Sequence, residues 1–136
     1  MTKALVVTGA GGVGKTTISA ALAVTAARSG LRTLVLTVDP AQRLSTALGI
    51  AIGNEPDPHP EEEGLWVAML DATASWQEVV RRHADPDVAE RLIDNEFFAA
   101  ATSHFPASQS FAAAEQAATY IDARAWDLVV IDTPPA

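Results

Sequence analysis

The sequence predicts an α/β fold with a mostly parallel sheet between helices. Short apolar runs alternate with segments of helical pattern along the 136 residues, which is the element order of a parallel sheet with crossover helices. The run at residues 33–38 is apolar on both faces, as buried parallel strands are. The first run leads directly into a glycine-rich segment that opens a helix.

The first predicted strand and helix lie on either side of that glycine-rich segment. Residues 4–8 are a β-prone apolar run, and residues 15–29 read as a helix. Gly30 follows at the position after a helix end that favours a left-handed residue. One face of this helix carries Ile18, Ala21, Leu22 and Thr25.

The next elements continue the alternation of strand and helix. Residues 33–38 form an apolar strand, after which Asp39 and Pro40 are a natural cap and first residue for a short helix that Gly49 closes. Residues 53–64 hold three prolines and five acidic residues, so we expect a surface loop. Residues 65–70 form a third strand.

Helices dominate the predicted second half of the chain. Ser75 and Glu78 have the spacing of a capping box, and Asp85 followed by Pro86 starts another helix. A longer helix covers residues 108–123, with an inner side made by Ala114, Ala118 and Ile121. A last short strand, residues 128–131, delivers Asp132 to its carboxyl end.

The segment after the first strand matches the phosphate-loop pattern GxxxxGK[ST] at every fixed position. Glycines allow a concave turn whose N–H groups point at phosphate oxygens, and the following helix adds its partial positive charge. Lysine in this pattern reaches the β- and γ-phosphates, and the next hydroxyl ligates Mg²⁺. The predicted nucleotide-binding residues are Gly9, Ala10, Gly11, Gly12, Val13, Gly14, Lys15, Thr16 and Thr17.

Two aspartates are expected at the same edge of the sheet as this loop. Ligands of parallel α/β sheets lie beyond the carboxyl ends of the strands, where Asp39 and Asp132 follow the second and last strands. Each has a simpler explanation, because Asp39 can be only a helix cap and Asp132 only a turn residue. Their shared edge beside a magnesium nucleotide favours a functional role for both.

Composition sets limits on function and location. The net charge of −8 and pI near 4.6 argue against general affinity for nucleic acid or anionic membranes. No cysteine is present, so disulfides and thiolate sites are excluded. Residues 1–136 read as one domain without a signal peptide or membrane-spanning run, and we expect a cytoplasmic protein.

Three segments together resemble one family. Residues 7–17, residues 36–41 and residues 130–135 look like the successive nucleotide motifs of the arsenical pump-driving ATPase family, which includes the ATPases that target tail-anchored membrane proteins. Within it, the sequence looks most like the bacterial anion-transporting ATPases. The resemblance implies a three-layer P-loop NTPase fold and ATP hydrolysis with Mg²⁺. It also implies a homodimer, or a heterodimer with a related subunit, whose opening and closing drives a partner such as a membrane-protein client or transporter.

The resemblance also assigns roles to residues. Lys15 and Asp39 would be catalytic, with Asp39 matching the first-switch aspartate that positions the attacking water. Thr16 would hold Mg²⁺ directly, while Asp132 matches the second switch and would act on the metal through water.

Two departures from the family pattern matter. Ala10 fills a position where many members of the larger group carry a second lysine that contacts phosphate across the dimer interface. Ala136 ends the chain just after the second-switch motif, so we expect the family's fold to be incomplete at the C-terminus. The strands before the phosphate loop and before Asp132 would then lack neighbours and expose apolar surface.

Two other functions stay open at this point. A hydrolytically weak nucleotide-binding subunit that regulates an active partner is favoured by Ala10. A small-molecule kinase or synthetase on the same scaffold is less favoured, because no acceptor-binding motif is visible.

Overall fold

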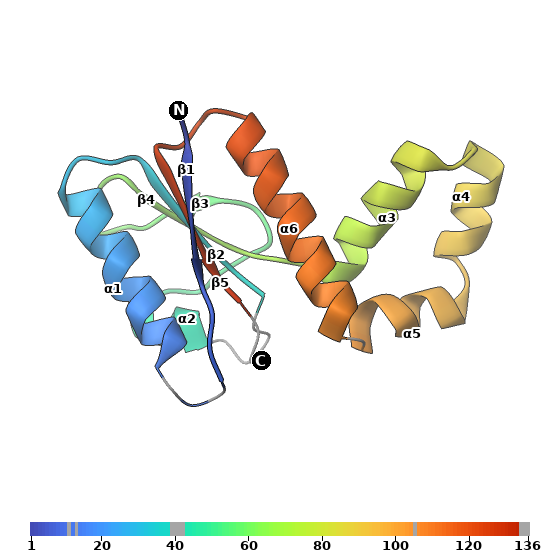
Figure 1. Ribbon diagram of the computed structural model, residues 1–136, viewed down its shortest axis with the longest axis horizontal. Coiled ribbons are helices and arrows are strands. Elements are labelled where there is room, and N and C mark those ends of the chain that lie inside the picture. The colour runs from blue at the N-terminus through green and yellow to red at the C-terminus, as the bar shows by residue number, and fades with distance from the viewer. Residues whose placement is uncertain (11, 13, 39–42, 105, 134–136) are drawn as a thin grey trace.

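A computed structural model describes residues 1–10, 12, 14–38, 43–104 and 106–133 (Figure 1). The elements along the chain are β1 (Lys3–Val7), α1 (Lys15–Arg28), β2 (Thr33–Thr37), α2 (Arg43–Leu48), β3 (Asp57–Pro58), β4 (Leu65–Met69), α3 (Ala72–His83), α4 (Pro86–Ile93), α5 (Glu96–His104), α6 (Pro106–Asp122) and β5 (Leu128–Asp132). None of the helices in this part of the chain is long and apolar enough to cross a lipid bilayer.

The strands form one sheet in the order β1-β5-β2-β4-β3. The first four strands run parallel to one another, and the two-residue β3 runs antiparallel to β4. Val7 and Thr37, the last residues of β1 and β2, both pair in register with Asp132 of β5. The prediction of an α/β fold with a mostly parallel sheet is confirmed.

The neighbours of β5 in the sheet differ from those that the sequence predicted. β5 lies between β1 and β2, so the prediction that the strand ending at Asp132 lacks a neighbour is wrong. β1 does lie at the edge of the described sheet, and its Leu5 and Val6 expose 38% and 52% of their surface. The apolar surface expected beside the phosphate-loop strand is therefore present.

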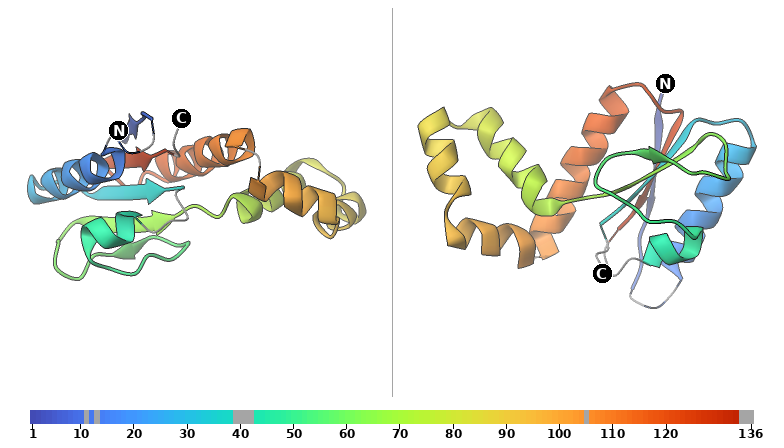
Figure 2. Two further views of the ribbon diagram at one scale, coloured as in Figure 1. Left: turned by 90° about the horizontal axis from the view of Figure 1, so that it is seen from below. Right: turned by 180° about the vertical axis from the view of Figure 1, so that it is seen from behind.

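Helices cover both faces of the sheet, which gives three layers. Val35 of β2 points into a cluster with α1 and α2, whereas Leu34 and Leu36 point into a cluster with α6. Successive residues of a strand face opposite sides, so α1 and α6 lie on opposite faces. Figure 1 shows the strands between α1 and α6, and both views of Figure 2 show α3, α4 and α5 extending away from the sheet beyond α6.

The buried face of α1 differs from the apolar face that the sequence pattern indicated. Ser19, Ala20, Ala23 and Ala27 are buried, whereas the predicted face is exposed, Ile18 by 51% and Leu22 by 39%. Small side chains let a helix approach a sheet closely, and hydrophobic periodicity alone does not register this advantage.

The predicted inner side of α6 is confirmed at Ile121, which packs against the core cluster, but is wrong at its two alanines. Ala112, Ala113 and Ala117 are buried, but Ala114 and Ala118 are exposed. Alanines occupy both sides of this helix, so their pattern does not identify one face.

Local elements differ in three further places. The helix predicted to start with a capping box begins earlier, at Ala72, because the carboxylate of Asp71 accepts a hydrogen bond from the Ala74 N–H at 3.1 Å. α5 was not predicted, and β3 lies within the predicted acidic loop. The helix start at Asp85 and Pro86 is confirmed, with the proline in the first turn of α4.

Candidate functional site

The turn between β1 and α1 has the backbone of an anion-binding loop. Gly12 and Gly14 have φ values of 81° and 88°, in the left-handed region. Gly14 is the N-cap of α1, and no side chain caps the helix there. The first N–H groups of α1 are therefore left for an external acceptor, and a helix N-terminus favours an anion.

Lys15 places a positive charge at this helix start. The residue is only 7% exposed, and among the described residues no carboxylate lies within ion-pair distance of its ammonium group. A buried charge without a partner is costly. A phosphate group would supply the missing negative charge.

A cavity of about 490 Å³ opens beside the loop. Its described lining residues are Gly12, Gly14, Lys15, Thr16, Thr17, Arg43 and Thr46. They include two cations and no acid, in a chain whose net charge is −8. Among the described lining residues, positive charge therefore predominates, which suits a polyanion.

Two lining residues, Arg43 and Thr46 of α2, were missed in the sequence analysis. The available signal was topological, because α2 follows the carboxyl end of a strand next to β5. Predicted phosphate-loop residues Gly9 and Ala10 are half-buried and exposed, respectively. Gly11 and Val13 lie outside the described residues.

Asp132 lies at the carboxyl end of β5 and is 1% exposed. Its Oδ2 accepts hydrogen bonds from the hydroxyls of Thr16, at 3.1 Å, and Thr37, at 3.2 Å. Its Oδ1 is 3.3 Å from the hydroxyl of Ser19. The structure therefore brings Thr16 and Asp132, the two predicted metal-site residues, into direct contact.

Ser19 and Thr37 were not predicted as site residues. Ser19 lies one helical turn after Lys15 on α1, and Thr37 ends the strand beside β5. Helical spacing and strand order were the signals that would have found them. The predicted residues Asp39, Pro40 and Ala41 lie outside the described residues, so Asp39 stays a prediction.

The oxygen ligands at this edge fit a small, hard cation. Mg²⁺ prefers oxygen ligands and usually keeps several waters beside substrate phosphates, with few protein groups. Here the protein would offer the Thr16 hydroxyl and the Asp132 carboxylate. No group of three or more His, Cys, Asp or Glu side chains able to hold a metal occurs in the described ranges, so a site made of protein ligands alone is not formed there.

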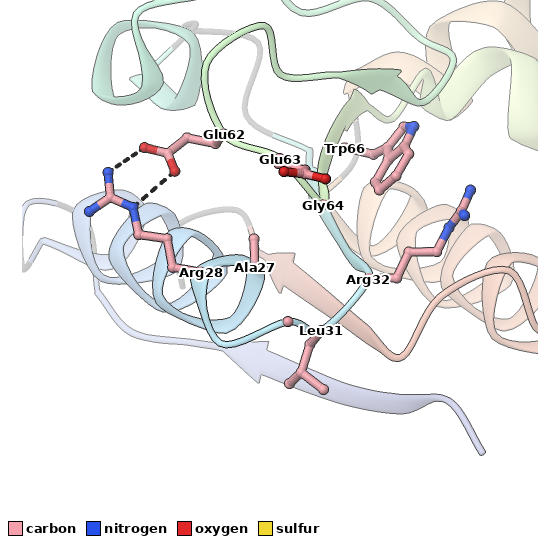
Figure 3. A pocket seen from close by; sticks show the side chains of 9 residues that line it. Ala27, Arg28, Leu31, Arg32, Glu62, Glu63, Gly64 and Trp66 are labelled. Atoms are coloured by element: carbon pink, nitrogen blue, oxygen red, sulfur yellow. Dashed lines mark hydrogen bonds and ion pairs between the residues drawn. The ribbon is translucent and has the colours of Figure 1, made fainter.

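A second pocket lies at the opposite end of α1 and has different chemistry (Figure 3). The Arg28 guanidinium donates two hydrogen bonds to the carboxylate of Glu62, and this lowers the pKa of Glu62. The Arg32 guanidinium lies 4.4 Å from the centre of the Trp66 ring. These charges already have partners within the protein, whereas the Lys15 ammonium has no carboxylate within ion-pair distance in the described part of the chain.

Comparison with known proteins agrees with this geometry. A family model described as an anion-transporting ATPase matches residues 2–136. The chain belongs to this family of ATPases. The family resemblance seen in the sequence is thereby confirmed.

Three relatives of this anion-transporting ATPase family member show how much of the chain is matched. An uncharacterized Streptomyces coelicolor protein is 37% identical over 141 residues, covering 98% of this chain and 34% of that protein. The arsenical pump-driving ATPase of Escherichia coli is 31% identical over 134 residues, covering 94% and 23%. The Paramecium tetraurelia protein named ATPase ASNA1 homolog 1 is 31% identical over 141 residues, covering 98% and 40%. The chain therefore spans from 23% to 40% of the length of these relatives.

Proposed function

We propose that this chain binds ATP with Mg²⁺ and takes part in hydrolysis of the β–γ phosphoanhydride bond. One observation carries the proposal: Lys15 and the uncapped start of α1 line a cavity that also contains Thr16, which contacts the buried Asp132. Cation, helix dipole and oxygen ligands are the groups that phosphoryl transfer requires, because its catalysis consists mainly of positioning and charge neutralisation. The Paramecium tetraurelia and Escherichia coli relatives are named as ATPases, and these names support ATP as the nucleotide.

Each described residue has one part in this chemistry. The N–H groups at the start of α1 bind phosphate oxygens and fix their direction. Lys15 neutralises charge on the β- and γ-phosphates. Thr16 and Asp132 would hold the cation that lies beside these phosphates. Mg²⁺, when bound, neutralises charge on the phosphate oxygens. We further propose that Asp39 positions the attacking water, as the family resemblance implies.

We also propose that the nucleotide cycle opens and closes a dimer that drives a partner in the cytoplasm. The arsenical pump-driving name of the Escherichia coli relative supports a transporter as partner. The inclusion of tail-anchored targeting ATPases in the resembled family supports a membrane-protein client as the other choice.

A second candidate function is a regulatory subunit that binds nucleotide and turns it over slowly. Ala10 supports it, because this exposed position carries no cation. A second lysine there would add positive charge close to the phosphates. A kinase or synthetase is a weaker third candidate, since no acceptor-binding motif is visible.

Phosphate release from Mg-ATP by the purified protein separates the three. Steady release without an added acceptor supports the ATPase, and binding without turnover supports the regulatory subunit. Transfer that requires an added small molecule supports the kinase. The Lys15→Met variant is the control for contaminating activity and should abolish both tight binding and release. Equal ATP binding by this variant would contradict the proposed site.

A further inference from the structure

Three hydroxyl groups surround the buried carboxylate of Asp132, and they differ in what else they do. Thr16 lines the nucleotide cavity and is half-buried. The Ser19 hydroxyl has a single proton to donate. Its oxygen lies nearer to the backbone carbonyl of Lys15, at 3.0 Å, than to Asp132 Oδ1, at 3.3 Å. Thr37 is 2% exposed and donates to Oδ2 from the neighbouring strand.

Strand register fixes Thr37 opposite Asp132. The two residues pair across β2 and β5, and both side chains point to the face that α1 covers, as Val35 and Val130 do two residues earlier. Leu70 donates its backbone N–H to the Thr37 carbonyl at 2.7 Å, so the end of β2 is held from its other side as well. The Thr37 hydroxyl is thus attached to a rigid part of the sheet.

We propose that Thr37 is a positioning residue that holds the Asp132 carboxylate in the orientation needed for the metal side of the nucleotide site. The inference rests on the proposed function, since it concerns how the same site takes Mg²⁺ with ATP. Hydrogen bonds to a charged acceptor are about twice as strong as neutral ones, and Thr37 gives Oδ2 such a bond without facing the cavity. Thr37 therefore acts through Asp132 and touches neither nucleotide nor metal.

The test compares Thr37→Val with Thr33→Val. Both variants remove a buried threonine hydroxyl from the same strand and the same face, but the Thr33 hydroxyl donates to the Leu31 carbonyl at 3.0 Å, at the far end of β2. Calorimetry measures the ATP dissociation constant with Mg²⁺ and again with EDTA. The readout is the dissociation constant in EDTA divided by the dissociation constant with Mg²⁺. This ratio reports the contribution of the metal without any turnover.

We expect Thr37→Val to reduce the magnesium-dependent gain in ATP affinity about tenfold, which is near the lower end of what one hydrogen bond to a charged group contributes. ATP affinity in EDTA should change less than about twofold, because the phosphate loop is untouched. Thr33→Val should leave the ratio unchanged, and Thr37→Ser should retain it because it keeps the hydroxyl.

Each other outcome has a definite meaning. An unchanged or increased ratio in Thr37→Val overturns the inference. If that variant does not fold, Thr37→Ala against Thr37→Ser makes the same comparison, because their side chains differ only in the hydroxyl. An absence of ATP binding by the unmodified protein overturns the proposed function instead, so the two failures are distinguishable.

Discussion

Two glycines at opposite ends of α1 allow the phosphate loop's role in binding to be separated from its role in folding. Gly14 precedes the helix with φ 88°, and Gly30 follows it with φ 93°. A Cβ atom at either position would have no heavy atom within 4 Å, so alanine adds backbone strain but no clash. The left-handed region costs an alanine about 1–2 kcal/mol. The less flexible unfolded chain returns about 0.4–1 kcal/mol, so each variant should lose about 1 kcal/mol of unfolding free energy.

Thermal unfolding with and without Mg-ATP distinguishes the two positions. Both variants should unfold about 4 °C below the unmodified protein in the absence of ligand. Free ATP at 100 times its dissociation constant stabilises a protein by about 2.7 kcal/mol. Gly30→Ala should keep this stabilisation. Gly14→Ala should lose at least about 1.4 kcal/mol of it, a tenfold loss of affinity, because the strained residue directly precedes the phosphate-binding N–H groups of α1. Equal stabilisation of the two variants by Mg-ATP would refute the assignment of the loop.

Four further predictions concern single residues. Asp39→Asn should keep Mg-ATP binding while abolishing turnover, and undiminished single-turnover hydrolysis would remove Asp39 from its role. Ala10→Lys should accelerate hydrolysis tenfold or more, since a cation inserted at the transferring phosphate is worth up to about three to five powers of ten; an unchanged rate in an intact dimer would contradict this. Arg43→Gln should weaken ATP binding in calorimetry, whereas Arg91→Gln, on the remote helix α4, should not. Asp71→Ala should destabilise the protein by about 1 kcal/mol in urea unfolding through loss of the α3 cap, with ATP affinity unchanged.

The parts of the site that were predictable from the sequence depend on short-range rules. A glycine-rich turn between a strand and a helix has few possible geometries, and the structure gives Gly14 the left-handed backbone that the pattern requires. Asp132 was predictable because the last apolar run ends there and because ligands gather at the carboxyl ends of parallel strands.

The unpredicted parts depend on contacts between distant segments. Arg43 joins the cavity through the packing of α2, and Thr37 reaches Asp132 only because β5 inserts beside β2. No local pattern in the sequence gives this strand order. The predicted face of α1 was wrong for a related reason, since alanines pack against the sheet where larger apolar residues were expected to do so.

Strand order also connects the two halves of the site. The residue after Asp132, Thr133, donates both its N–H, at 3.3 Å, and its hydroxyl, at 2.7 Å, to the carbonyl of Val7. Val7 ends β1, and the phosphate loop begins two residues later at Gly9. The chain leaving Asp132 is therefore attached to the chain entering the loop, while Asp132 itself is attached to Thr37 on the other side. Any displacement of Asp132 must strain hydrogen bonds to both neighbouring strands. The geometry of the site therefore depends on the β1-β5-β2 strand order more than on any one sequence motif.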